Sequence, residues 1–91
     1  MIKVHLPSQL TGLADGRKCI EVHAASSLSE VFRKIDEAAP MLRSQIFDSN
    51  GAIRQFIGIF LDERQINDLE NGAQPVREDS QILIIMSVAG G

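Results

Sequence analysis

The chain has little of several features that mark whole classes of protein. It contains one cysteine, Cys19, among 91 residues. No intramolecular disulfide can therefore form, and we expect a cytoplasmic protein. No apolar run approaches the roughly 20 residues that a membrane-spanning helix needs. Residues 1–6 alternate in the manner of a strand and lack a signal-peptide pattern. The sequence therefore predicts a small domain with no membrane partner.

Positive charge and catalytic motifs are also sparse. The sequence has nine lysine and arginine residues and twelve aspartate and glutamate residues, which give a net charge of −3. The basic residues are scattered singly or in pairs. Without a basic stripe, no nucleic-acid partner is expected, whereas mild acidity suits a protein partner with a basic docking surface. No glycine-rich nucleotide-binding motif occurs. The acids in predicted turns are expected to form a solvated surface, so we expect no catalytic residues and no bound cofactor: Asp62, Glu63, Asp68 and Glu70.

Two histidines and the cysteine are the remaining candidates for metal or thiol chemistry. His5 and His23 lie on adjacent predicted strands and could approach each other, but no third ligand joins them, so no metal site is expected. Cys19 and His23 share a strand face four residues apart, about 13 Å by strand rise, too far for a nucleophile and its base. We interpret Cys19 as a half-buried apolar residue.

Alternation and turn chemistry predict the elements of the first half. Residues 2–6 alternate apolar and polar, as do residues 19–23, which indicates two strands that form a hairpin. Ser27 and Glu30 make a capping box ahead of apolar residues at helical spacing, so a helix is expected over about 27–39, ended by Pro40. A short helical turn then precedes a loop at 48–51.

The second half is mostly strand. Residues 53–61 are expected to direct Ile57, Ile59 and Leu61 to one face and Phe56, Gly58 and Phe60 to the other. A tight turn at 62–64 leads into a short strand, and residues 67–80 read as a loop whose Val76 plugs the core. Residues 81–86 are apolar on both faces, with Ile82, Ile84 and Met86 inward, and this favours a central strand.

The order of elements predicts the fold class. Strand, strand, helix, strand, short strand, strand, with the last strand parallel to the first, is the α+β β-grasp arrangement of ubiquitin-like proteins. We expect a mixed four- to five-stranded sheet with one main helix packed on one face. Residues 1–91 are expected to be a single domain with a flexible tail at 87–91.

The last four residues of this tail are small, and they are Val88, Ala89, Gly90 and Gly91. Four extended residues reach roughly 13 Å from the last strand. The two glycines have no side chain, so the tail fits a channel too narrow for a Cβ. What such a tail would deliver is the α-carboxylate of Gly91.

The outward face of the predicted sheet is apolar near this tail. Alternation directs four apolar side chains away from the helix: Phe56, Phe60, Leu83 and Ile85. A small monomer rarely exposes such a patch without a partner. We therefore predict a docking face for another protein, with a homodimer contact or a covering loop as the alternative.

Two segments carry a family resemblance. The end of the chain reads Gln-Ile-Leu-Ile-Ile-Met-Ser-Val-Ala-Gly-Gly over residues 81–91, and residues 54–63 read Arg-Gln-Phe-Ile-Gly-Ile-Phe-Leu-Asp-Glu. Together with the strand order, they resemble the MoaD/ThiS family of ubiquitin-like sulfur carriers over essentially the whole chain, most of all its longer members in cysteine or siderophore biosynthesis. Two departures are the extra Gln55 and a Glu78-Asp79-Ser80 turn in place of Asp-Gly-Asp.

The resemblance implies a carrier that is not itself an enzyme. An ATP-dependent adenylating enzyme of the ubiquitin-activating type would convert Gly91 to an acyl-adenylate. A sulfur donor, persulfide or sulfide, would displace AMP and leave a thiocarboxylate. A sulfur-accepting biosynthetic enzyme would then use it in a cysteine, siderophore, thiamine or molybdopterin type pathway. A processing metalloprotease that removes residues after Gly91 would be a further partner.

Three alternatives remain open at this point. The same fold serves protein modifiers, which would be conjugated to lysines through Gly91. It also serves as the small subunit of a molybdopterin-synthase-like complex, whose tail enters a large catalytic partner. The third alternative is an interaction module with an inert tail. The sequence leaves open the acceptor metabolite and the sulfur donor.

Overall fold

The computed structural model describes residues 1–66 and 74–87, so the predicted tail residues Val88–Gly91 lie outside the described residues. The strands of the described part are β1 (Ile2–His5), β2 (Cys19–Val22), β3 (Ile57–Leu61), β4 (Arg64–Ile66) and β5 (Gln81–Met86). The helices are α1 (Leu28–Ala38) and α2 (Arg43–Ile46), with 3₁₀ segments η1 (Ser8–Ala14) and η2 (Pro40–Leu42).

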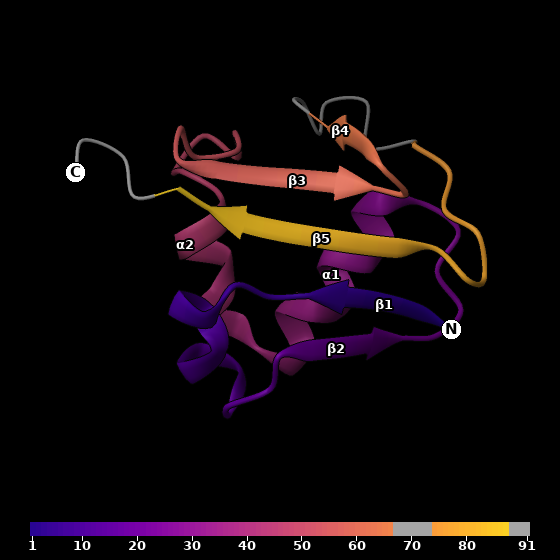
Figure 1. Ribbon diagram of the computed structural model, residues 1–91, viewed down its shortest axis with the longest axis horizontal. Coiled ribbons are helices and arrows are strands. Elements are labelled where there is room, and N and C mark those ends of the chain that lie inside the picture. Colours follow the sequence, from indigo (N-terminus) through magenta and orange to yellow (C-terminus); the bar gives the residue numbers. More distant parts are fainter. Residues whose placement is uncertain (67–73, 88–91) are drawn as a thin grey trace.

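The strands form one mixed sheet in the order β2-β1-β5-β3-β4. Strand β5 is parallel to β1 and antiparallel to β3, and it runs through the middle of the sheet (Figure 1). The hairpins β1–β2 and β3–β4 are antiparallel. The central position predicted for the last strand is confirmed, and so is the β-grasp arrangement.

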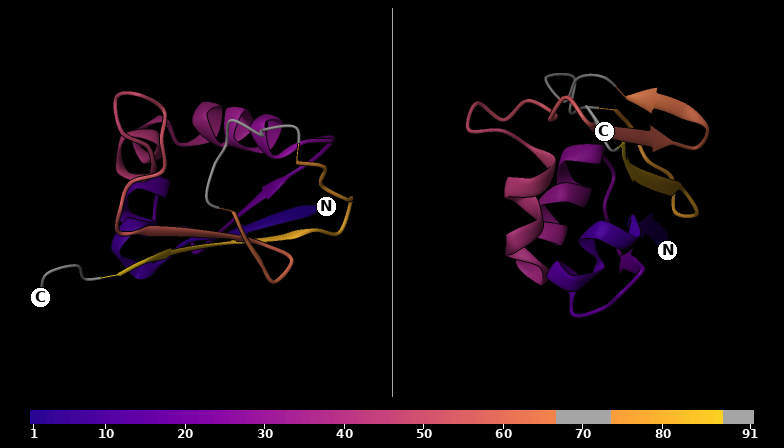
Figure 2. Two further views of the ribbon diagram at one scale, coloured as in Figure 1. Left: turned by 90° about the horizontal axis from the view of Figure 1, so that it is seen from above. Right: turned by 60° about the vertical axis from the view of Figure 1, so that its left-hand side comes forward.

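The helices lie on one side of the sheet, and among the described elements none covers the other side (Figure 2). Helix α1 directs four side chains into the core: Leu28, Val31, Phe32 and Ile35. The Phe32 ring meets Phe47 edge-on, with 5.3 Å between ring centroids. Val76 is buried as predicted. No helix of the described residues is long and apolar enough to cross a membrane.

Helix α1 begins where the capping pattern predicts. The Ser27 hydroxyl accepts a hydrogen bond from the Glu30 backbone N–H at 3.3 Å, which satisfies one of the free amides of the first turn. The Glu30 carboxylate accepts a hydrogen bond from the Ser26 hydroxyl at 2.9 Å instead of completing the reciprocal box. Ser27 is therefore the cap of α1, and Ser26 bonds only the Glu30 side chain.

The strand predicted over 53–61 is wrong in its first half, because β3 begins only at Ile57. The Ile57 N–H donates to the Arg54 carbonyl at 2.9 Å, so Arg54 to Ile57 form a turn in place of extended chain. Gln55 and Phe56 occupy the middle of that turn. The alternation that placed Phe56 on the outward face therefore does not extend to it.

Candidate docking face and tail exit

The outward face of β3 and β5 carries three of the four predicted docking residues. Phe60 pairs with Leu83 and Gly58 pairs with Ile85 across the two strands, which brings their side chains to the same face. Leu83 is 44% exposed and Ile85 is 41% exposed, and Phe60 is half-buried. Their place on the sheet matches the sequence analysis, and their role in docking stays a prediction.

Phe56 is the fourth predicted member, and its assignment to this surface is wrong. Its side chain is half-buried and packs against the hydrophobic core. Its backbone carbonyl accepts hydrogen bonds from the Ser87 N–H at 2.9 Å and from the Ser87 hydroxyl at 3.4 Å. Phe56 therefore holds the end of β5 in place and does not take part in an outward patch. From here on, the apolar patch means Phe60, Leu83 and Ile85.

The strand that leads into the tail is paired on both sides. Strand β5 is bonded to β1 on one side and to β3 on the other. Ser87 follows it directly and is tied to Phe56, as above. The predicted carrier residues Val88, Ala89, Gly90 and Gly91 begin one residue further on, outside the described residues. The first tail residue is thus attached to a fixed point beside the apolar patch.

A groove of about 750 Å³ extends along the same face, toward the start of β5. Its lining combines two residues of the apolar patch with polar and charged side chains: His5, Phe60, Asp62, Glu63, Arg77, Gln81 and Leu83. His5 Nε2 lies 2.7 Å from the Gln81 Oε1 atom, in hydrogen-bonding contact. The groove therefore continues the apolar patch into a polar region.

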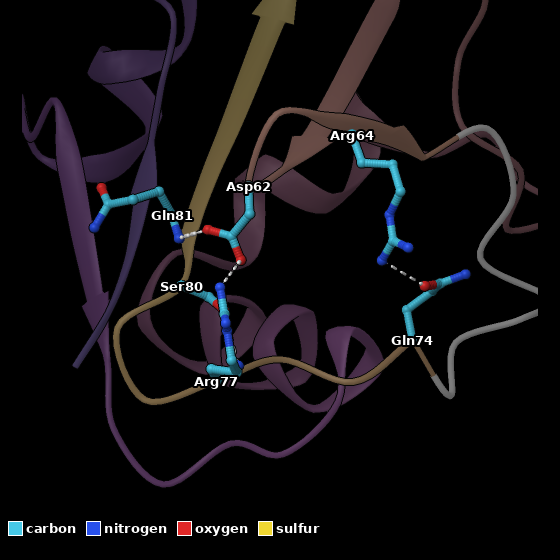
Figure 3. A network of polar contacts seen from close by, with 6 residues as sticks. All are labelled: Asp62, Arg64, Gln74, Arg77, Ser80 and Gln81. Atoms are coloured by element: carbon cyan, nitrogen blue, oxygen red, sulfur yellow. Dashed lines mark hydrogen bonds and ion pairs between the residues drawn. The ribbon is translucent and has the colours of Figure 1, made fainter.

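Asp62 organises this polar end (Figure 3). Its Oδ1 accepts a hydrogen bond from the Gln81 N–H at 2.8 Å, and its Oδ2 lies 3.9 Å from the Arg77 guanidinium. The Gln81 N–H is the main cause that lowers the pKa of Asp62. Burial opposes this lowering, and the Ser80 hydroxyl and the nearby Arg77 and Arg64 add to it. The carboxylate links the β3–β4 turn to the beginning of the central strand.

The histidines do not meet. The register of the first hairpin pairs His5 with Cys19 and Ile2 with Val22, so His23 follows the opposite end of the hairpin. The expectation that His5 and His23 could approach each other is wrong. The pairing of His5 with Cys19 was missed, because the connection between the strands folds as η1 and fixes a register that turn residues alone do not reveal. In the described part of the chain, no group of three His, Cys, Asp or Glu residues could hold a metal ion.

Comparisons with known proteins agree with this architecture. No protein-family model and no curated protein sequence matches the chain. CysO from Mycobacterium tuberculosis superposes with a TM-score of 0.83 at 17% identity, covering 97% of this chain and 100% of that one. A chain of the Amycolatopsis orientalis BexX/CysO complex gives a TM-score of 0.81 at 16% identity, with 100% of both chains covered. Small archaeal modifier protein 1 from Methanosarcina acetivorans gives 0.77 at 22% identity, covering 99% of this chain and 95% of that one.

The fold is therefore the β-grasp fold of ubiquitin-like proteins. The solved structures that share this fold include CysO and small archaeal modifier protein 1. At these identities the likeness shows the fold alone, and function is argued below from the residues.

Proposed function

We propose that this protein is a sulfur carrier, whose Gly91 carboxylate is adenylated by a partner enzyme and converted to a thiocarboxylate. The observation that carries the proposal is the position of β5. This strand is central, paired on both sides and fixed at Ser87, and it leads directly into a sequence that ends in Gly90-Gly91. A reactive end is presented best from a rigid element.

The chemistry requires activation from outside. The α-carboxyl group has a pKa of about 3.5, so at neutral pH it is an anion and a poor electrophile. Attack of this carboxylate on the α-phosphate of ATP gives the acyl-adenylate and pyrophosphate. Sulfide then displaces AMP and leaves the thiocarboxylate; with a persulfide donor, a further thiol must release the sulfur from an acyl disulfide. The protein contributes the carboxylate and its presentation, while the partner contributes ATP binding and catalysis.

The apolar patch supports the partner's role. Leu83 and Ile85 lie on β5, the strand that leads to the tail, and Phe60 lies beside them on β3. Their side chains share the face of the sheet that no described helix covers. A partner that held this face would receive the tail at a fixed distance from its own active site. The similarity to CysO, one structure of which is a complex with BexX, supports a function exercised in complexes.

Adenylation can be tested apart from sulfur transfer. With the cognate adenylating enzyme, the full chain should support exchange of radioactive pyrophosphate into ATP, because that step needs only the Gly91 carboxylate. Deleting Gly91 should abolish exchange and leave the melting temperature unchanged, since no core residue is altered. Exchange that persists after the deletion would contradict the proposal.

A second candidate is a protein modifier conjugated through Gly91. It is favoured by the similarity to small archaeal modifier protein 1. Both functions begin with the same adenylate, so exchange does not separate them. Isopeptide-linked Gly91 on lysines of target proteins, in cells where no thiocarboxylate forms, would establish the modifier function in place of sulfur carriage.

A further inference from the structure

The groove beside the apolar patch contains one charged group that has no partner among the residues that the structure describes. His5 is bonded to the Gln81 side chain, and Asp62 is engaged by the Gln81 N–H and by Arg77. Within residues 1–66 and 74–87, the Arg77–Asp62 contact is the only ion pair. Glu63 lines the groove and is exposed, with no hydrogen bond or ion pair to any described residue.

Two of the other residues that line the groove are apolar, and these are Phe60 and Leu83. Phe60 and Leu83 lie side by side on adjacent strands, and the turn that holds Glu63 follows directly after β3. An apolar surface that ends at a carboxylate matches one kind of side chain. Lysine and arginine bury a hydrocarbon stem along apolar surface and keep the cationic end free for an acid.

We infer that the groove receives a lysine or arginine side chain of the adenylating enzyme, with its stem on Phe60 and Leu83 and its charge at Glu63. The inference rests on the proposed function, because it concerns the partner that activates Gly91. The net charge of −3 points the same way, since it favours association with a basic surface. The apolar patch supplies affinity, and Glu63 supplies orientation and selectivity.

The backbone at Glu63 offers a way to separate this role from a structural one. Asp62 and Glu63 have φ angles of 48° and 76°, in the left-handed region, within a two-residue turn closed by the Leu61–Arg64 pair. Turns of this kind favour glycine at the second position. Replacing Glu63 by glycine should therefore relieve strain while it removes the carboxylate.

The test measures the affinity of the full chain for the adenylating enzyme at two salt concentrations. Glu63→Gln keeps the shape and removes the charge; affinity at low salt should fall about five-fold, and its salt dependence should decrease. Glu37→Gln is the matched control, because Glu37 is an exposed acid on α1 in the helical layer. This control should bind like the unmodified protein.

Glu63→Gly should lose the same affinity and yet raise the melting temperature by roughly 2 to 5 °C. A loss of binding in a more stable protein cannot come from unfolding. Unchanged binding by Glu63→Gln, while Ile85→Asp weakens binding by about 30-fold, would overturn the inference and leave the proposed function standing. Equal losses for Glu63→Gln and Glu37→Gln would also overturn it. If Ile85→Asp binds normally, the proposed docking face itself is wrong.

Discussion

The Ile85 side chain lies directly over Gly58 on the exposed face of the sheet. A Cβ atom placed on Gly58 would stand 2.9 Å from Ile85 Cγ1 and 3.2 Å from Ile85 Cδ1. The two residues face each other across β3 and β5. The absence of a side chain at Gly58 therefore sets the position of an apolar residue next to the strand end from which the tail departs.

Gly58→Ala should move Ile85 out of this position. Cγ1 is close to the backbone and the side chain is β-branched, so the clash can be relieved only by a change of χ1 or a shift of the strands. We expect a loss of stability of about 1 kcal/mol, measured by chemical denaturation. Affinity for the adenylating enzyme should fall as well. The double variant Gly58→Ala, Ile85→Ala removes the clash and should recover much of the lost stability.

Ile85→Asp and Phe56→Asp should have opposite effects, although the sequence placed both residues on one face. Ile85 is exposed, so aspartate there should leave the melting temperature nearly unchanged and weaken docking by about 30-fold, the effect of losing an interface anchor worth about 2 kcal/mol. Phe56 packs against the core. Aspartate at 56 should cost about 3 kcal/mol or more of stability. Unfolding by Ile85→Asp with tolerance of Phe56→Asp would reverse the assignment.

The cap of α1 provides a stability test that does not involve docking. Ser27→Ala removes the acceptor for the Glu30 N–H and should cost about 1 kcal/mol of unfolding free energy. Ser26→Ala removes only the contact between an exposed hydroxyl and the Glu30 carboxylate, and should cost less. Equal losses in denaturation experiments would contradict the assignment of Ser27 as the cap.

The lowered pKa of Asp62 predicts a pH dependence of stability. The Gln81 N–H favours the ionised carboxylate in the folded state, so the folded pKa lies below the ordinary value of 3.8. The resulting stabilisation is present above that ordinary value and is lost as the pH falls through the folded pKa. Asp62→Asn keeps an acceptor and removes the charge; it should be less stable at neutral pH by up to about 1 kcal/mol.

The comparison is made by denaturation across the acid range. The difference between Asp62→Asn and the unmodified protein should shrink toward zero at the acid end, where both side chains are neutral. If the two proteins still differ in stability at the acid end, the charge of Asp62 is not the cause of the difference in stability.

The sequence predicted the parts of this structure that depend on local patterns. The alternation in β1 and β2, the cap at Ser27 and the two-faced apolar strand β5 all use short-range signals, and each was confirmed. The placement of Leu83 and Ile85 followed from β5 alone. Successive side chains of a strand point to opposite faces, so the residues between the buried ones must point outward.

What the sequence could not predict depends on contacts between distant residues. Phe56 fits an alternating pattern, but the Arg54–Ile57 turn removes it from the strand and its carbonyl bonds to Ser87 instead. The pairing of His5 with Cys19 depends on how residues 6–18 fold between the strands. The groove joins residues from four separate segments, and only the assembled sheet brings them together.

The most direct test of sulfur carriage is the intact mass of the full chain after incubation with the adenylating enzyme, ATP and a sulfur source. The mass should rise by the difference between one sulfur and one oxygen atom, and fragmentation should place the change at Gly91. Gly90→Val should block the change, because a β-branched residue restricts the backbone and does not fit a channel shaped for glycine. An unchanged mass, with an enzyme preparation that converts a control carrier, would contradict the proposal that this protein carries sulfur.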